Sequence, residues 1–322
     1  TRWHSVTGVQ TCALPIFKRL EEIYEDFDRE YFRKDIDNTC KACELCCTST
    51  FRYPDLSALE YDYLKKYVKE NNISPSVDNF KNFFQYKDSP YCPYWSKEKG
   101  CRVYLARPMF CRMFGLFRFE GDSELPKSCV FYGKRIDVTD ESRYKIIKNL
   151  PEYMDLIYKY GLLKAENKEE KLEILIKMGK DYITQSRLEE ALSILSEVEK
   201  IDPHNVSVLF DLAFIYREMN KPEKSKEKLE RSIYLGGEEK YPYIHQHYGF
   251  VCLTMNCLEE AHKAFMKAIE LEPDSMLPYL GMALFFSVRE ENVKALEYCR
   301  KALEINPQDP VALNLAQSIL KL

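Results

Sequence analysis

Residues 242–275 read PYIHQHYGFVCLTMNCLEEAHKAFMKAIELEPDS, and this stretch decides the fold of the C-terminal half. Aligning its Pro273 with Pro203 and Pro307 exposes a period of 34 residues. The period divides the chain into registers 172–205, 206–239, 242–275 and 276–309. A repeat of this length predicts a stack of helix pairs, because one pair cannot bury its apolar face alone.

Marker residues make the array resemble tetratricopeptide repeats. The third register carries them at Tyr248, Gly249, Ala261, Phe265, Ala268 and Pro273. The second register is weaker, with Ser225 where alanine is expected and two extra residues at its end, so we expect an irregularity near Gly236-Gly237. Residues 310–322 are predicted to cap the array.

The resemblance implies a groove lined by the first helix of each repeat. Its predicted lining is mostly apolar and aromatic: Ile176, Lys180, Ile183, Phe210, Phe214, Arg217, Tyr243, Phe250, Leu253, Leu280 and Leu284. We expect this groove to hold a partner helix or an extended peptide. The alternative is that the chain's own cysteine-bearing part fills it. Repeats that bind chaperone tails use a lysine and an asparagine as a carboxylate clamp. This chain has Ile176 and Lys180 at those two positions, so it does not match that pattern.

Eight cysteines mark the N-terminal half: Cys40, Cys43, Cys46, Cys47, Cys92, Cys101, Cys111 and Cys129. The first four lie in eight residues, with the two-residue spacing that wraps several sulfurs around one metal. No histidine lies between residues 17 and 203, so thiolates would hold the metal, which favours zinc, iron, an iron-sulfur cluster or copper(I). Eight thiols are enough for two metal centres of four cysteines each. The alternative is one such centre, with the remaining cysteines structural or redox-active. Disulfides are the alternative, although adjacent Cys46 and Cys47 are awkward to bridge.

The cysteine pattern resembles the YkgJ-type cysteine-cluster family, to which zinc or iron chelation is ascribed. Its C-x-x-C-x-x-C-C motif spans Cys40 to Cys47, and its further motifs match at Cys92-Pro93, Cys101, Tyr104, Arg107, Pro108, Cys111 and Arg112. The resemblance covers about residues 35–135 and implies metal chelation. Distant relatives include flagellin lysine methylases. The alternative function is therefore an iron-sulfur-dependent protein-modifying enzyme that recruits its substrate through the repeats.

Arginines 102, 107, 112 and 118 lie among the cysteines, and residues 101–118 contain no acid. Guanidinium groups would lower thiol pKa values and compensate a thiolate centre. Nucleic-acid binding is the less favoured alternative, because four arginines are a small electrostatic footprint and the whole chain has 47 basic against 51 acidic residues. We expect neither nucleic acid nor membrane as a partner.

The remaining patterns predict a mainly α protein. Helices are predicted at 17–38, from the capping box Ser57-Ala-Leu-Glu60, and after Pro151. The cysteine-bearing segment 91–135 has little apolar periodicity, so metal ligation is expected to replace packing there. No apolar run reaches the length of about 18 residues that spans a membrane. Residues 6–16 look like translated sequencing adapter, and 1–16 are left out of the fold.

We therefore predict a cytoplasmic protein in which an irregular, cysteine-rich, metal-binding domain precedes an α-solenoid. It would act as an adaptor or as a metal- or redox-responsive partner protein. The predicted limits are 17–163 for the cysteine domain, 164–171 for a linker, 172–309 for four repeats and 310–322 for the capping helix.

Overall fold

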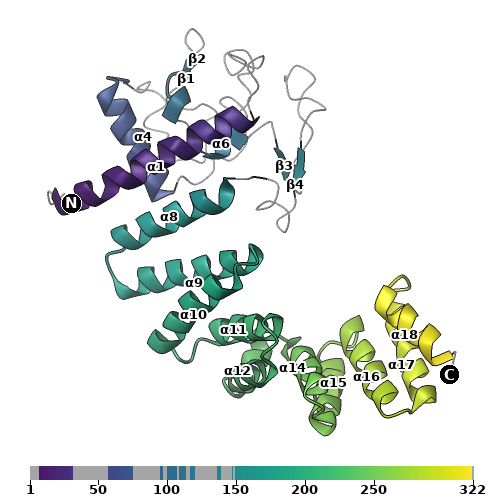
Figure 1. Cartoon of the computed structure of the whole chain (residues 1–322). Helices are drawn as coiled ribbons and strands as arrows, with labels where there is room; N and C mark the ends of the chain where they lie inside the picture. The colour runs from purple at the N-terminus through teal and green to yellow at the C-terminus, as the bar shows by residue number, and fades with distance from the viewer. Residues whose placement is uncertain are drawn as a thin grey trace. The chain divides into compact units, whose positions relative to one another are not determined.

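The computed structural model shows a chain built mainly of α-helices, which divides into two compact units, residues 1–174 and 175–322 (Figure 1). The structure describes residues 7–31, 57–74, 95–96, 100–106, 109–113, 117–119, 136–138, 147 and 149–320. Within these ranges, every helix is too short or too polar to cross a lipid bilayer. The predicted fold class, mainly α, is confirmed.

Three helices form the core of the first unit: α1 (Thr7–Tyr31), α4 (Ala58–Glu70) and α8 (Leu150–Lys164). Apolar residues spaced three and four apart turn one face of α1 inward, and Leu20 and Phe27 are fully buried there. The predicted capping box begins α4, since the Ser57 hydroxyl accepts the Glu60 N–H at 3.2 Å. Pro151 lies in the first turn of α8, where its missing N–H leaves no helical bond unmade.

Several short elements lie between α4 and α8. They are the antiparallel pair β1 (Trp95–Ser96) and β2 (Gly100–Cys101), the 3-10 helix η2 (Tyr104–Ala106), α6 (Met109–Met113), and the parallel pair β3 (Phe117–Phe119) and β4 (Ile136–Val138). Val103, Ala106 and Met109 are at most 3% exposed and belong to the same hydrophobic cluster as α1, α4 and α8. The expectation that metal ligation replaces packing is therefore wrong for these three residues, which pack on the helical core.

Two predicted boundaries fall inside helices. α1 begins at Thr7, within the segment left out of the fold, and it ends at Tyr31. The remainder of the helix predicted at 17–38 lies outside the described residues. α9 (Lys168–Thr184) begins inside the predicted linker, and the two units divide between residues 174 and 175. The domain limits themselves stay a prediction.

The second unit is an array of helix pairs. Their helices are α9 with α10 (Leu188–Ile201), α11 (Val206–Glu218) with α12 (Pro222–Tyr234), α14 (Ile244–Thr254) with α15 (Leu258–Leu271), and α16 (Met276–Val288) with α17 (Asn292–Ile305), followed by α18 (Pro310–Leu320). Each turn within a pair contains one non-glycine residue at a φ of 56° to 60°: Ser186, Asn220, Asn256 and Glu290. These residues recur at the predicted period, with the insertion in the middle of the series.

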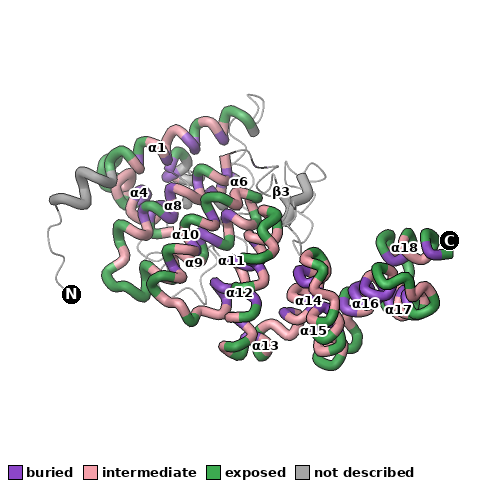
Figure 2. The backbone as a smooth tube through the Cα atoms, turned by 60° about the horizontal axis from the view of Figure 1, so that its bottom comes forward, coloured by how far each residue is buried: buried purple, intermediate pink, exposed green. Residues whose placement is uncertain are grey.

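Close helix packing around Phe265 of α15 explains two of the marker glycines. A Cβ atom at Gly249 would lie 2.6 Å from the Phe265 ring, and one at Gly281 would lie 2.3 Å from it. Only glycine lets α14 and α16 approach this fully buried ring. Figure 2 shows buried positions recurring along α14 and α16. The predicted α-solenoid of helix pairs is confirmed.

The irregularity predicted near Gly236-Gly237 is confirmed as an extra helical turn. Gly236 has a φ of +80°, which glycine adopts without the strain that a Cβ atom would cause. The short helix α13 (Gly237–Lys240) follows, and Tyr241 and Tyr243 lead from it into α14. The insertion thus places two aromatic residues directly before the third repeat.

A polar cluster around Asp211 joins α9, α11 and the segment after α13. The Lys180 ammonium lies 3.0 Å from the Ser207 hydroxyl and 3.8 Å from the Asp211 carboxylate. The Tyr241 hydroxyl donates to Ser207 at 2.8 Å. Burial raises the pKa of Asp211 to about 6, against the opposing effect of Lys180 and Lys240. Burial of the ionised Asp211 carboxylate in the folded state therefore lowers the stability of this unit.

Replacing Asp211 with asparagine is expected to stabilise the second unit at pH 7 by about 1–3 kcal/mol. The pKa of Asp211 in the folded chain lies above its ordinary value of 3.8, so the contribution of Asp211 to stability is fully present below that pH and is lost as the pH rises through about 6. The gain should therefore vanish near pH 4. Denaturant unfolding at both pH values measures it, with the exposed Asp274→Asn as control. A gain of equal size at both pH values would contradict this prediction.

Candidate metal centre and partner groove

Few of the eight predicted metal ligands lie in the described part of the chain. Cys40, Cys43, Cys46, Cys47, Cys92 and Cys129 lie outside it. Cys101 is the last residue of β2, directly before the turn that leads into η2, and Cys111 is the central residue of α6. The described residues by themselves contain no group of three or more side chains that could hold a metal. The full ligand set stays a prediction.

Arg112 attaches α6 to the helical core. Its side chain is 1% exposed, and one guanidinium nitrogen donates to the Asp28 carboxylate of α1. The other terminal nitrogen donates to the carbonyl of Leu105 in η2 at 2.6 Å. The guanidinium carbon also lies 4.1 Å from the centre of the Tyr24 ring, which adds a cation–π contact. One side chain thus joins α1, η2 and α6.

Glu60 holds the other end of α6. Its Oε1 accepts the Met109 N–H at 2.9 Å and the Tyr24 hydroxyl at 3.3 Å. Its Oε2 accepts the N–H and the hydroxyl of Ser57 at 3.2 and 3.0 Å. A buried carboxylate at the N-terminus of α6 satisfies an N–H that has no partner within the helix. Glu60 therefore serves two helices, as part of the capping box of α4 and as the acceptor for α6.

These contacts change the interpretation of Arg112. A guanidinium that is buried and paired with Asp28 cannot reach a phosphate, so this residue does not support nucleic-acid binding. Its charge is matched by a carboxylate, whereas the sequence predicted that it compensates thiolates. Arg107 lies outside the described residues, as does the side chain of Arg118.

The predicted groove residues occupy the first helices of the four pairs, with Tyr243 as the N-cap of α14. Some of these side chains pack against or bind other residues of the array. Leu280 is 5% exposed and packs with Ala302, while the half-buried Phe250 ring lies against Phe265 at 5.1 Å. Lys180 is bound to Ser207 and Asp211, as described above. Ile176, Ile183, Phe214, Leu253 and Leu284 are half-buried.

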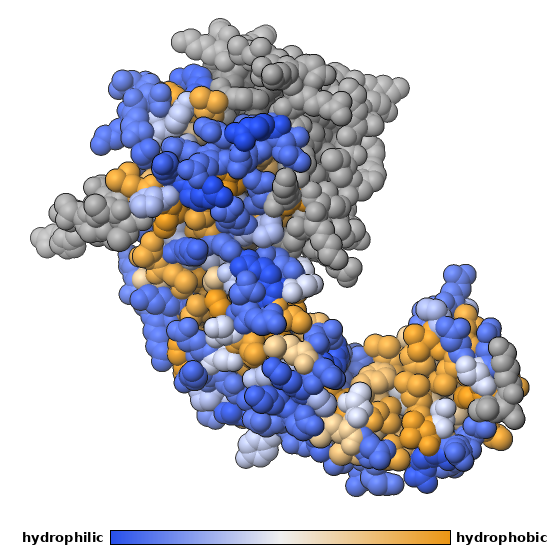
Figure 3. All heavy atoms as spheres, viewed as in Figure 1, coloured by the Kyte–Doolittle hydropathy of each residue, from blue (hydrophilic) through white to orange (hydrophobic). Residues whose placement is uncertain are grey.

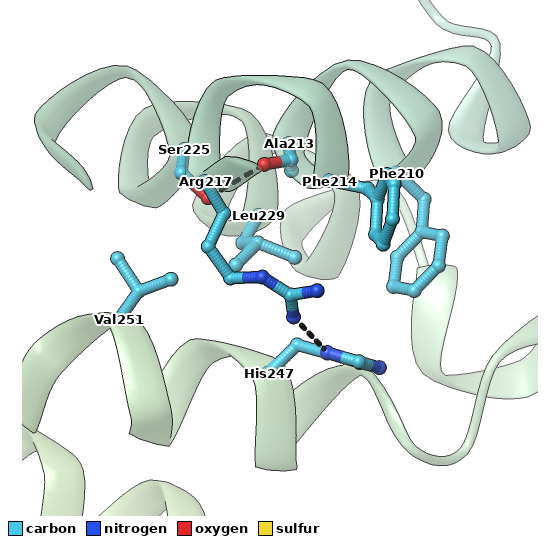
Figure 4. Close-up of a pocket in the computed structure, with 8 residues that line it drawn as sticks. All are labelled: Phe210, Ala213, Phe214, Arg217, Ser225, Leu229, His247 and Val251. Carbon is cyan, nitrogen blue, oxygen red and sulfur yellow. Dashed lines mark hydrogen bonds between the residues drawn. The ribbon is translucent and has the colours of Figure 1, made fainter. Parts of the chain in front are cut away.

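A small pocket with about 10 Å³ of free volume lies between α11, α12 and α14 (Figure 4). Its lining is mostly apolar: Phe210, Ala213, Phe214, Arg217, Ser225, Leu229, His247 and Val251. Ser225, which replaces the expected alanine, donates its hydroxyl proton to the carbonyl of Ala213 at 2.8 Å. Three predicted groove residues, Phe210, Phe214 and Arg217, therefore share this one site.

Arg217 and His247 form a polar pair in the lining of the pocket. The Arg217 guanidinium lies 3.0 Å from Nδ1 of His247, and because arginine only donates, His247 accepts at Nδ1 and carries its proton on Nε2. Burial, followed by the nearby Arg217 charge, lowers the pKa of His247 to about 4, so the ring is neutral at pH 7. Beside this contact, the Arg217 guanidinium donates from Nε and Nη2 to the Glu218 carboxylate at 3.2 and 2.9 Å.

Aromatic rings extend the pocket toward α13. Phe210 stacks on Tyr241 with 4.8 Å between ring centres, and it meets Tyr243 and His247 edge to face. The groove lining predicted from the sequence included neither Tyr241 nor His247. The two-residue insertion before α14 was the available signal, because it moves these residues next to Phe210.

The C-terminal part of the array presents a more aliphatic surface. Figure 3 shows apolar side chains gathered over α14 to α18 in this view. The exposed apolar residues of α16 and α18 include Leu277, Val288, Val311, Leu313 and Leu320. Contiguous exposed apolar surface of this kind is typical of an interface.

The cysteines of the repeats have structural positions. Cys252 and Cys299 are at most 1% exposed, and Cys257 is the half-buried N-cap of α15. Burial raises the pKa of Cys252 to about 11, so its thiol is unreactive at neutral pH. Cys252 and Cys299 are thus packing residues of the array.

Comparisons with known proteins identify both parts of the chain. Residues 39–145 match the CxxCxxCC family model, described as a "Putative zinc- or iron-chelating domain", and residues 243–275 match a tetratricopeptide repeat model. The type IV pilus assembly protein PilF of Pseudomonas aeruginosa is 23% identical over 159 residues, which are 48% of this chain and 62% of that protein. The BBS4 homolog of the BBSome complex in Drosophila melanogaster is 22% identical over 44% of this chain and 29% of its own length. The chain thus spans less than two thirds of either relative.

Solved structures resemble the repeats. A tetratricopeptide repeat protein from Parabacteroides merdae has a TM-score of 0.48 and 16% identity, covering 56% of this chain and 72% of its own. The protein YrrB, described as having an unusual peptide-binding site, has a TM-score of 0.46 and 18% identity, covering 55% of this chain and 88% of its own. Both likenesses concern the fold alone. The chain thus matches the CxxCxxCC model over residues 39–145 and a tetratricopeptide repeat model over residues 243–275.

Proposed function

We propose that this protein is a metal-binding adaptor, in which cysteine thiolates of residues 40–129 hold zinc or iron and the repeats bind a protein partner. The observation that carries the proposal is the family match of residues 39–145, which contains all eight cysteines. The placement of Cys111 on a helix anchored to the core supports it. Thiolates are soft ligands that suit zinc, iron and iron-sulfur clusters alike. The cytoplasmic location predicted from the sequence belongs to the same proposal.

The cysteine domain is expected to contain metal when the full chain is purified without oxygen. Elemental analysis and visible absorption measure the metal and its type. Changing Cys111 to serine should lower the bound metal, because serine is a poor ligand for soft metals. Changing Cys257 to serine, a half-buried cysteine of the repeats, should leave it unchanged. Metal-free protein in which the eight cysteines titrate as thiols or pair as disulfides would disprove the metal centre.

The repeat array is proposed to bind its partner at the pocket between α11 and α14. Three features support this proposal: the apolar lining, the aromatic rings around Phe210, and the donors of Arg217 and His247. A partner segment with an apolar side chain next to a carbonyl or carboxylate oxygen would complement all three. The relatives give no partner for this chain.

A photo-crosslinking amino acid at Phe214 is expected to capture a protein partner in cells. Phe214 is half-buried in the pocket lining, whereas Tyr234, on α12 and outside the pocket lining, is 88% exposed and serves as the control position. The crosslinked species should form from position 214 alone, and Arg217→Ala should reduce its yield several-fold because buried donors contribute strongly to interfaces. Equal capture from both positions would argue against the pocket as the binding site.

A further inference from the structure

α6 is held at both ends by side chains from other elements. At its first residue the Met109 N–H donates to Glu60 of α4, and Arg112 near its end donates to Asp28 of α1. A helix of five residues is far too short to be stable alone, so these contacts hold it in place. Cys111 lies between the two anchors.

The anchors belong to the helical core of the first unit. Asp28 and Glu60 lie on α1 and α4, whose apolar faces share one hydrophobic cluster with α8. Met109 contributes a fully buried side chain to that cluster. The backbone of Cys111 is therefore set by protein contacts on both sides.

We propose that Asp28, Glu60 and Arg112 are positioning residues that hold Cys111 in place before any metal binds. This inference rests on the proposed metal centre. A ligand that is already ordered loses less conformational entropy when the metal binds, and the affinity rises accordingly. Residues that orient metal ligands typically change the metal affinity 10–100-fold when replaced.

The test compares two aspartates of α1 in the full-length chain. Asp28 binds the buried Arg112, whereas Asp26 binds the exposed Arg29 at 2.9 Å. Competition with a chelator, without oxygen, measures the affinity for zinc and for ferrous iron. Asp28→Asn is expected to weaken binding about 10–100-fold. Asp26→Asn should change it by less than about twofold, because exposed ion pairs contribute little. Equal effects of the two variants would overturn the inference.

A double-mutant cycle separates positioning from general destabilisation. If Asp28 acts through Cys111, Asp28→Asn should weaken metal binding in the wild-type background and change it little when Cys111 is already serine. Independent, additive effects of Asp28→Asn and Cys111→Ser would show that Asp28 does not act through this thiol.

Hydrogen exchange in the metal-free chain tests the anchoring itself. The Met109 amide, whose N–H is bound by Glu60, should be protected in the wild type and exchange at least about tenfold faster in Asp28→Asn and Glu60→Gln. Unchanged exchange in both variants would overturn the inference. If the wild-type chain binds neither metal, the proposed metal centre fails, and this exchange experiment then decides the anchoring separately.

Discussion

The buried guanidinium of Arg112 is the contact on which the cysteine-bearing unit depends. It bonds a carboxylate of α1 and a carbonyl of η2 from a position on α6, and it lies over the Tyr24 ring. A charge can be buried at this depth only because each contact replaces part of its lost hydration. Removing one partner of such a pair typically destabilises a protein by about 3–5 kcal/mol, since the other charge is left unpaired. Among the described residues, α6 is thus fixed to the helices by the polar contacts of Arg112 and Glu60 and by a few apolar side chains.

The described core of the first unit is built by apolar packing between helices. Small metal-binding domains often have too little apolar surface to fold without their metal. In this chain α1, α4 and α8 bury a large cluster among themselves, and Val103, Ala106 and Met109 join it.

In the repeat array, one irregularity shapes the groove. The extra turn at α13 brings Tyr241 and Tyr243 against Phe210, and it places His247 beside Arg217. Because the groove charges are bound internally, its remaining surface is aromatic near α11 and aliphatic toward α18. In a regular array, every repeat would present its side chains at equivalent positions. The insertion makes one site of this array different from the others, because it adds aromatic side chains beside Phe210.

The sequence by itself determined the helix pairs and their period, because the marker residues report local packing that repeats every 34 residues. It also determined the capping box at Ser57 and the irregularity at Gly236, since both follow from local hydrogen bonding or backbone geometry. The tertiary structure alone decided the roles of Asp28, Glu60 and Arg112. Their partners lie 84 and 49 residues away along the chain, and no sequence period reports a contact of that separation. For the same reason the structure decided how far the groove residues are packed inside: Phe250 and Leu280 hold groove positions in the repeat pattern, yet contacts with neighbouring helices leave Phe250 half-buried and Leu280 buried.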